Sequence, residues 1–133
     1  MQAWGLTDPG MVRSQNQDHY QIVKLNREQL LAIVCDGMGG ARSGNIASQM
    51  AVEVFVEEVK RTARSNMKPE RIDNMLEQAL ELANKAVYEQ SQLSDEYRGM
   101  GTTLVAAYIQ KDQLTVANVG DSRGYLLNKE GIK

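Results

Sequence analysis

Three aspartates stand beside a glycine or at the start of an apolar segment, where a carboxylate can be held on a rigid element. Asp36 ends an apolar run and is followed by Gly37, Asp121 follows Gly120, and Asp18 begins another apolar segment. Hard divalent cations such as Mg²⁺ and Mn²⁺ prefer carboxylates, backbone carbonyls and water. A glycine beside the carboxylate lets the backbone come close to such an ion. The pattern indicates a metal site, although a single Asp-Gly pair is equally typical of a turn.

The glycine-rich segment that follows Asp36, DGMGGARSGN, matches neither of the common nucleotide-binding fingerprints. The dinucleotide fingerprint needs a third glycine at the position of Arg42. The phosphate loop of nucleotide hydrolases needs a lysine and then Ser or Thr after its last glycine, where this chain has Asn45 and Ile46. A nucleotide-binding domain is therefore disfavoured.

Arg13 lies five residues before Asp18 in the segment RSQNQDHY. Its planar guanidinium group suits the oxygens of a phosphate. Taken singly, these residues have simpler explanations: Arg13 as part of a surface ion pair, Asp18 as a cap and Asp121 as a turn residue. Only their combination favours a site that joins metal ions to a phosphate group.

The composition is that of an ordinary globular domain, with 133 residues, 42% hydrophobic residues and a formal net charge of −2. We find no basic run of the kind that nucleic-acid binding needs, and no apolar run near the roughly 18 residues of a membrane span. Cys35, the single cysteine, rules out a disulfide framework within the chain and favours a reducing compartment. The N-terminus lacks the pattern of a signal peptide, so we expect a cytoplasmic protein.

Hydrophobic periodicity predicts strands joined by hairpins before and after a pair of helices. We expect strands over residues 2–6, 18–25, 30–36, 102–110, 113–120 and 124–128, and helices over residues 45–62 and 69–93. Asn45 is expected to cap the first helix, and Pro69 to take the first position of the second. The strand over residues 30–36 is apolar on both faces and is expected to be covered on both. Hairpin connections make the strands antiparallel, which indicates an α+β fold.

Four segments in this order, RSQNQD, VCDGMGG, GTTLVAA and VGDSRGY, together resemble the metal-dependent protein serine/threonine phosphatases of the PP2C (PPM) family. The bacterial branch, whose members work with partner kinases, is the most similar. The resemblance covers nearly the whole chain. It implies an α-β-β-α sandwich of two antiparallel sheets, of which this chain would form a part with one helical hairpin on an outer face.

The resemblance also implies roles for individual residues. Asp36 would bridge two Mn²⁺ or Mg²⁺ ions, the carbonyl of Gly37 would complete one coordination sphere, and Asp18 would act through metal-bound water. Arg13 would hold the substrate phosphate, and Asp121 would help to bind a third ion. The implied reaction is hydrolysis of phosphoserine and phosphothreonine in proteins by a metal-activated water, with Asp18 and Asp36 as the catalytic residues.

Two features depart from the family pattern. Met38 stands where many eukaryotic members have a histidine proposed as a general acid, although bacterial members commonly have methionine there. His19 is the only histidine in the sequence, and we expect it to have a structural role. The family pattern also continues past Lys133 with two further ligand aspartates, so we interpret residues 1–133 as the N-terminal portion of one phosphatase domain whose C-terminal half is absent.

We therefore expect the intact domain to be active and the 133-residue chain by itself to be inactive or weak. The alternative is a non-catalytic, phosphatase-like binding module. The expected partners are phosphoproteins that a serine/threonine kinase produces, and the kinase itself, with no nucleic acid and no membrane insertion. Unpaired strand edges are expected to let the chain associate with itself.

Overall fold

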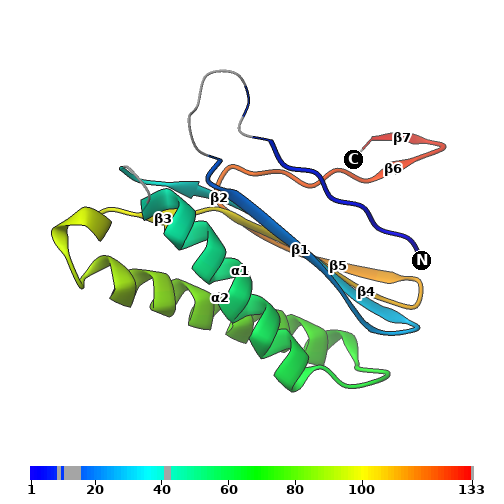
Figure 1. Cartoon of the computed structure of the whole chain (residues 1–133). Coiled ribbons are helices and arrows are strands. Elements are labelled where there is room, and N and C mark those ends of the chain that lie inside the picture. The colour runs from blue at the N-terminus through cyan, green and yellow to red at the C-terminus, as the bar shows by residue number, and fades with distance from the viewer. Residues whose placement is uncertain (9, 11–15, 41–42, 133) are drawn as a thin grey trace.

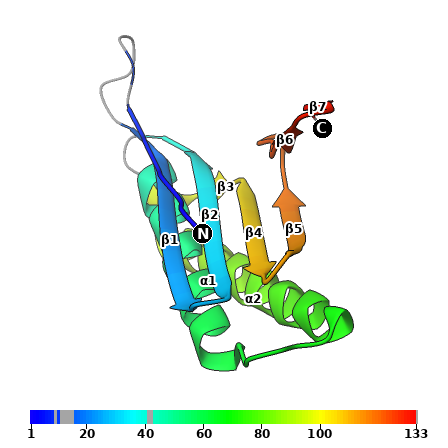
Figure 2. The same cartoon turned by 90° about the vertical axis from the view of Figure 1, so that its right-hand side faces the viewer.

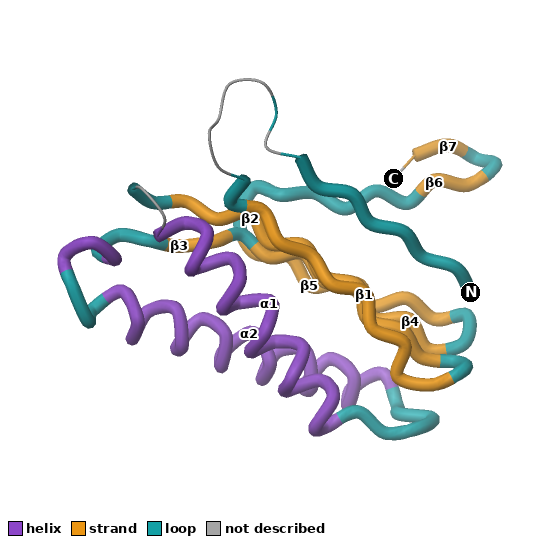
Figure 3. The backbone as a smooth tube through the Cα atoms, viewed as in Figure 1, coloured by secondary structure: helices purple, strands orange, loops and turns teal. Residues whose placement is uncertain are grey.

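The structure is a computed structural model, and it describes residues 1–8, 10, 16–40 and 43–132. Two helices lie side by side and cover one face of an antiparallel sheet (Figure 1). The N-terminal segment and a second, two-stranded sheet lie away from the helices (Figure 3). The α+β class and the helical hairpin on one outer face are confirmed.

The larger sheet has the strand order β1-β2-β4-β5, with the short strand β3 beside β2 at one end (Figure 2). The strands are β1 (Asp18–Asn26), β2 (Gln29–Met38), β3 (Gly101–Thr102), β4 (Leu104–Gln110) and β5 (Gln113–Val119). The smaller sheet pairs β6 (Leu127–Asn128) with β7 (Gly131–Ile132). Every pairing is antiparallel, as the hairpin connections predicted.

The helices are α1 (Ser43–Thr62) and α2 (Pro69–Ser91), followed by the 3-10 turn η1 (Asp95–Tyr97). Both α-helices carry apolar residues at spacings of three and four, and these residues form the side that packs into the core. Pro69 takes the first helical position, where its missing N–H costs no hydrogen bond. Within the described residues, neither helix contains an apolar stretch long enough to cross a membrane.

The core lies between the helices and one face of the sheet. Leu31, Ile33 and Cys35 alternate along β2 and turn their side chains into the core, where they join Phe55 of α1 and Tyr108 of β4. This alternation is the period of a strand that is covered on the helix side. The burial of this apolar surface is the main force that holds the hairpin of helices against the sheet.

The opposite face of the sheet is only partly covered. Val34, which faces Tyr20 across β1 and β2, keeps 49% of its surface exposed. The N-terminal segment crosses this face so closely that a Cβ on Gly5 would overlap the ring of Tyr20. The prediction of cover on both faces thus holds for the helix side and only in part for the other side, because both helices pack on the same face.

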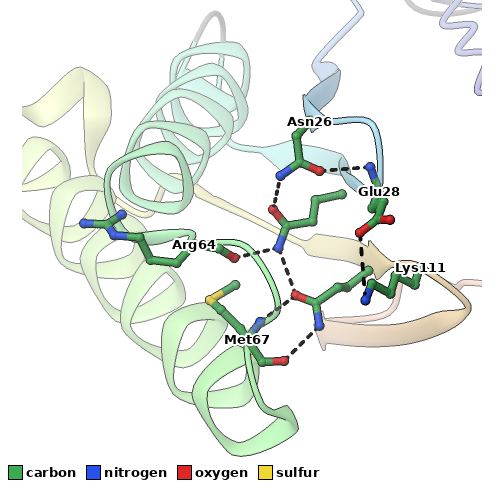
Figure 4. A network of polar contacts seen from close by, with 7 residues as sticks. Asn26, Glu28, Arg64, Met67 and Lys111 are labelled. Carbon is green, nitrogen blue, oxygen red and sulfur yellow. Dashed lines mark hydrogen bonds and ion pairs between the residues drawn. The ribbon is translucent and has the colours of Figure 1, made fainter.

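A buried pair of glutamines ties the loop between the helices to the end of the sheet (Figure 4). Gln110 Nε2 donates to the carbonyl of Met67 over 2.8 Å, and its Oε1 accepts from the amide of Met67 over 2.9 Å. Gln29 Nε2 donates to Gln110 Oε1 over 2.9 Å and to the carbonyl of Arg64 over 2.7 Å. These bonds satisfy polar groups that lie away from water, and we call the two residues the glutamine clamp.

Four predictions about the elements need correction. Residues 2–6 form no strand, because this segment crosses the face of the sheet instead of pairing along its edge. Asn45 does not cap α1 but lies inside it, since the helix begins at Ser43. The strand expected over residues 124–128 is reduced to Leu127–Asn128, and α2 ends two residues earlier than predicted.

The strand expected over residues 102–110 is divided at Thr103 into β3 and β4. Thr103 accepts the amide of Asp36 with its side chain, where a regular ladder would use its carbonyl. Its own amide still donates to the carbonyl of Asp36 over 2.9 Å. The strand is therefore divided because the hydroxyl of Thr103 replaces its carbonyl as the acceptor for the amide of Asp36, which is a candidate site residue.

Candidate active site

Asp18 and Asp36 are brought together by the hairpin of β1 and β2. Their Cα atoms are direct partners in the register of the two strands. The neighbouring pair, Gln17 and Gly37, is joined by a backbone hydrogen bond of 3.0 Å from the amide of Gly37. Hydrogen-bonded and non-bonded pairs alternate in an antiparallel ladder, so Asp18 and Asp36 form a non-bonded pair, whose side chains come closer.

The two carboxylates share the face of the sheet that points away from the helices, because residues opposite each other in a sheet point the same way. Asp18 lines an open hollow of about 590 Å³ between this face and the N-terminal segment. Like charges directly opposite each other destabilise a sheet unless a cation lies between them. The opposed carboxylates of Asp18 and Asp36 are therefore a candidate site for a cation.

Thr103 fixes Asp36 from the other side. Its Oγ1 accepts the amide of Asp36 over 3.1 Å and its amide donates to the carbonyl of Asp36 over 2.9 Å. The same hydroxyl lies 2.5 Å from Oγ of Ser122. Thr103 is 2% exposed, so these bonds form away from water, where an unmade bond is costly.

Asp121 lies in a turn whose flanking residues, Gly120 and Ser122, contact Thr103 at the same end of the sheet. Gly120 has φ +95°, and a Cβ there would lie 2.8 Å from Cγ2 of Thr103. Together with the contact of Ser122, this places both residues that flank Asp121 against Thr103. Asp121 itself is exposed. The structure therefore brings the Asp121 turn next to the strand of Asp36.

Gly37 lies where no other residue fits. A Cβ at Gly37 would overlap the carbonyl of Gly44 in the first turn of α1, and a Cβ at Gly44 would lie 2.6 Å from the side chain of Gln17. The glycines thus allow α1 to begin against the end of β2. Gly37 and Gly44 thus serve the close packing of the helix start against the strand end.

The remaining sequence-predicted residues have different outcomes. Arg13 lies outside the described residues. Met38 is exposed at the end of β2. His19 points toward the helix side, where its Nδ1 lies 2.8 Å from Oγ of Ser48, which agrees with the structural role expected of it. Asp18 begins β1 after a turn in which Oδ1 of Asn16 accepts its amide over 3.0 Å.

The donor set fits a hard divalent cation in part. Two opposed carboxylates and the backbone of Gly37 are the oxygen ligands that Mg²⁺ and Mn²⁺ prefer, completed by water. In the part of the chain that the structure describes, however, no three His, Cys, Asp or Glu side chains gather closely enough to hold one ion. These residues would therefore bind such an ion weakly without further ligands.

Burial excludes the cysteine next to Asp36 as a nucleophile. Burial raises the pKa of the Cys35 thiol to about 12, and a hydrogen bond with Thr102 offsets only part of that effect. The thiol is thus protonated near neutral pH, and the thiolate is the reactive form. Burial likewise raises the pKa of Tyr108 to about 12, and its hydroxyl has no hydrogen-bond partner among the residues that the structure describes.

Sequence reasoning missed three residues that hold the site together: Thr103, Ser48 and the backbone of Gln17. Thr103 lies in the quoted segment GTTLVAA, where two adjacent hydroxyl residues before an apolar strand were a usable signal. Ser48 lies on the buried side of α1. A serine on an apolar helix face is a weaker signal, because its hydroxyl usually bonds within its own helix.

Comparison with known proteins identifies close relatives of the chain. The sequence pattern of the Protein phosphatase 2C family matches residues 12–131. The serine/threonine phosphatase Stp of Listeria monocytogenes is 39% identical over 127 residues, which are 96% of this chain and 50% of that protein. The chain thus spans about half the length of the curated relatives it matches.

Solved structures agree with this result. The S. agalactiae serine/threonine phosphatase has a TM-score of 0.83 and 38% identity, over 96% of this chain and 52% of that one. The catalytic domain of the phosphatase PstP in complex with two manganese ions has a TM-score of 0.73 and 30% identity, over 94% of this chain and 50% of that one. With most of its length matched in sequence and in fold, the chain belongs to the protein phosphatase 2C family.

Proposed function

We propose that the protein hydrolyses phosphoserine and phosphothreonine in proteins, and that residues 1–133 are the N-terminal portion of its single phosphatase domain. The family relationship supports the reaction class. The observation that carries the proposal for this chain is the opposed pair of Asp18 and Asp36, two carboxylates held in a non-bonded register pair at the end of β2.

Each site residue has a part in this proposal. Asp36 and the carbonyl of Gly37 would hold the divalent cations, Asp18 would act through metal-bound water, and Asp121 would contribute to a further ion. Arg13 binds the phosphate of the substrate, an assignment that comes from its motif alone. We propose Mn²⁺ or Mg²⁺ as the ions, and the manganese in the related PstP structure supports the first.

The reaction needs only water as its co-reactant. A water oxygen attacks phosphorus, the bond from phosphorus to the serine or threonine oxygen breaks, and that oxygen takes up a proton. The products are inorganic phosphate and the free hydroxyl residue. When bound, the divalent cations would supply an activated water near neutral pH and neutralise charge on the phosphoryl group.

In this proposal, the main contribution of the residues described is to hold the metal-binding groups in position. Thr103 bonds to the backbone of Asp36 on one side and the strand of Asp18 pairs with it on the other, so the backbone that carries this carboxylate is held before any ion arrives. Such preorganisation matters because a loosely held ligand must be ordered each time that the site is filled. The proposed partners are the phosphoprotein substrates and the kinase that phosphorylates them.

The test is hydrolysis of a phosphothreonine peptide by the intact phosphatase domain, with Mn²⁺ and with a chelator. We expect activity that requires Mn²⁺ and that falls about a hundredfold or more in Asp36→Asn, because losing several kcal/mol of charge stabilisation has that effect on the rate. Asp112→Asn, in the exposed turn between β4 and β5, is the matched control and should act like the wild type. Equal rates for Asp36→Asn and the wild type would contradict the proposal.

A second candidate function is a non-catalytic module that binds phosphoproteins. The specific observation in its favour is that the described residues do not gather three metal-ligating side chains. Binding of the phosphothreonine peptide without release of phosphate, at any Mn²⁺ concentration, would support this alternative over the enzyme.

A further inference from the structure

A buried serine on α1 contacts the backbone of Gln17, the residue that precedes the site residue Asp18. Ser48 is 0% exposed, and its Oγ lies 2.5 Å from the carbonyl oxygen of Gln17 and 2.8 Å from Nδ1 of His19. A weaker contact of 3.2 Å joins the same hydroxyl to the carbonyl of Asn45 within the helix. This serine therefore does more than bond to its own helix.

The positions of the protons follow from these contacts. A carbonyl oxygen can only accept, so the hydroxyl proton of Ser48 must lie toward Gln17. The hydroxyl cannot then donate to His19 as well, and Nδ1 of the imidazole must be the donor. Neutral His19 is thereby held in the form that carries its proton on Nδ1 and leaves Nε2 without one. We call this chain of bonds, from His19 through Ser48 to Gln17, the serine relay.

The relay ends at the point where the two strands of the site are joined. The carbonyl of Gln17 accepts the hydroxyl of Ser48 and also the amide of Gly37, over 3.0 Å. Gln17 is the residue before Asp18, and Gly37 is the residue after Asp36. The bond between them is thus the backbone bond that borders the non-bonded aspartate pair.

We propose that Ser48 is a positioning residue, which fixes the Gln17 carbonyl and so sets the separation of Asp18 and Asp36 for a shared divalent cation. Ser48 touches neither aspartate side chain in this role and acts through backbone. The inference rests on the proposed function, because that function is what makes the separation of the two carboxylates matter.

The first experiment tests the serine relay in the absence of metal and substrate, by determining which ring nitrogen of His19 carries the proton. His19 is the only histidine of the sequence, and its ring nitrogens can be observed by ¹⁵N NMR at pH 8. We expect the Nδ1–H form in the wild type and a shift toward the Nε2–H form in Ser48→Ala. The loss of the signals in His19→Gln secures their assignment. An Nε2–H form in the wild type would overturn the relay.

The second experiment measures Mn²⁺ binding by calorimetry in the full protein. Removing a group that orients a metal ligand typically weakens metal affinity 10- to 100-fold, so we expect Ser48→Ala to lower Mn²⁺ affinity about tenfold. Ser48→Thr keeps a hydroxyl that can make the same bonds and should restore most of the affinity. Ser91→Ala is the matched control, since Ser91 is a buried serine of α2 that bonds to its own helix at Tyr88.

The outcomes separate this inference from the proposed function. Reduced Mn²⁺ affinity in Ser48→Ala with wild-type affinity in Ser91→Ala supports the positioning role. Equal affinities in the wild type and Ser48→Ala overturn it, even if the enzyme is active. Should the wild type bind Mn²⁺ and hydrolyse no phosphopeptide, the proposed function fails while the affinity comparison still decides the role of Ser48.

Discussion

Replacing Gln110 with leucine tests whether the glutamine clamp holds the helical hairpin to the sheet. The side chain is 7% exposed and takes part in three hydrogen bonds, two with the backbone of Met67 and one with Gln29. At about 1 kcal/mol net for each bond, Gln110→Leu should lower the free energy of unfolding by about 3 kcal/mol. The gain from burying leucine is offset by the Met67 amide and carbonyl that lose their partner.

Urea unfolding followed by circular dichroism measures this loss. For a slope of about 2 kcal/mol per molar urea, a loss of 3 kcal/mol moves the midpoint by about 1.5 M. Gln113→Leu is the matched control, because Gln113 is exposed and lies opposite Gln110 in the same hairpin. This control should stay within about 0.5 kcal/mol of the wild type.

A double-mutant cycle locates the effect within the clamp. Gln29→Leu combined with Gln110→Leu should show a coupling of about 1 kcal/mol, since the two side chains share one bond. The clamp lies seven residues along β2 from Asp36, about 24 Å at 3.4 Å per residue, so Mn²⁺ affinity should not change. If Gln110→Leu proves as stable as Gln113→Leu, the clamp contributes nothing and the reasoning is refuted.

Three further predictions concern the site and the core. Gly37→Ala should destabilise the fold by about 2 kcal/mol or more in a thermal unfolding experiment, because its Cβ would overlap a backbone carbonyl of α1; an unchanged midpoint would contradict the packing. Thr103→Val should lower stability by about 2 kcal/mol and weaken Mn²⁺ binding, since the amide of Asp36 loses its acceptor, whereas Thr103→Ser should keep both. Stability should also fall as pH rises above about 9, where the unfolded chain loses the thiol proton of Cys35 while the folded protein keeps it up to a pKa of about 12. The free energy of unfolding should fall by up to about 1.4 kcal/mol per pH unit for each such group. Tyr108 should add to this fall between pH 10 and about 12, where only the unfolded chain loses its phenol proton. Cys35→Ala should remove the part of this slope between pH 9 and 10, and a flat profile in the wild type would refute the assignment.

The sequence determined the elements whose signals are local. The apolar stripes predicted both helices to within about two residues, and Pro69 marked the start of the second. The position of Asp36 at the end of an apolar run was also readable, because a continuous run of apolar residues is visible without knowledge of distant partners. The four motifs, taken in order, were enough to indicate the family.

Contacts between distant segments could not be read in this way. Gln29 and Gln110 are 81 positions apart, and Asp36 and Thr103 are 67 apart. Each of these bonds exists only because β2 pairs with the strand that returns after both helices. The serine relay likewise depends on how α1 lies across the end of the sheet, which no local pattern encodes.

The register of the first hairpin shows most directly what the tertiary structure decided. Asn26 pairs with Gln29 beside the turn, and continuing that register would place Asp18 opposite Gly37. An irregularity between Lys24 and Asn26 shifts the pairing by one residue, so Asp18 lies opposite Asp36 instead. A shift of the register by one residue moves the side chains of a strand to the other face of the sheet. The residue types of the site were therefore fixed by the sequence, whereas one extra residue in a folded strand decided that the two carboxylates meet.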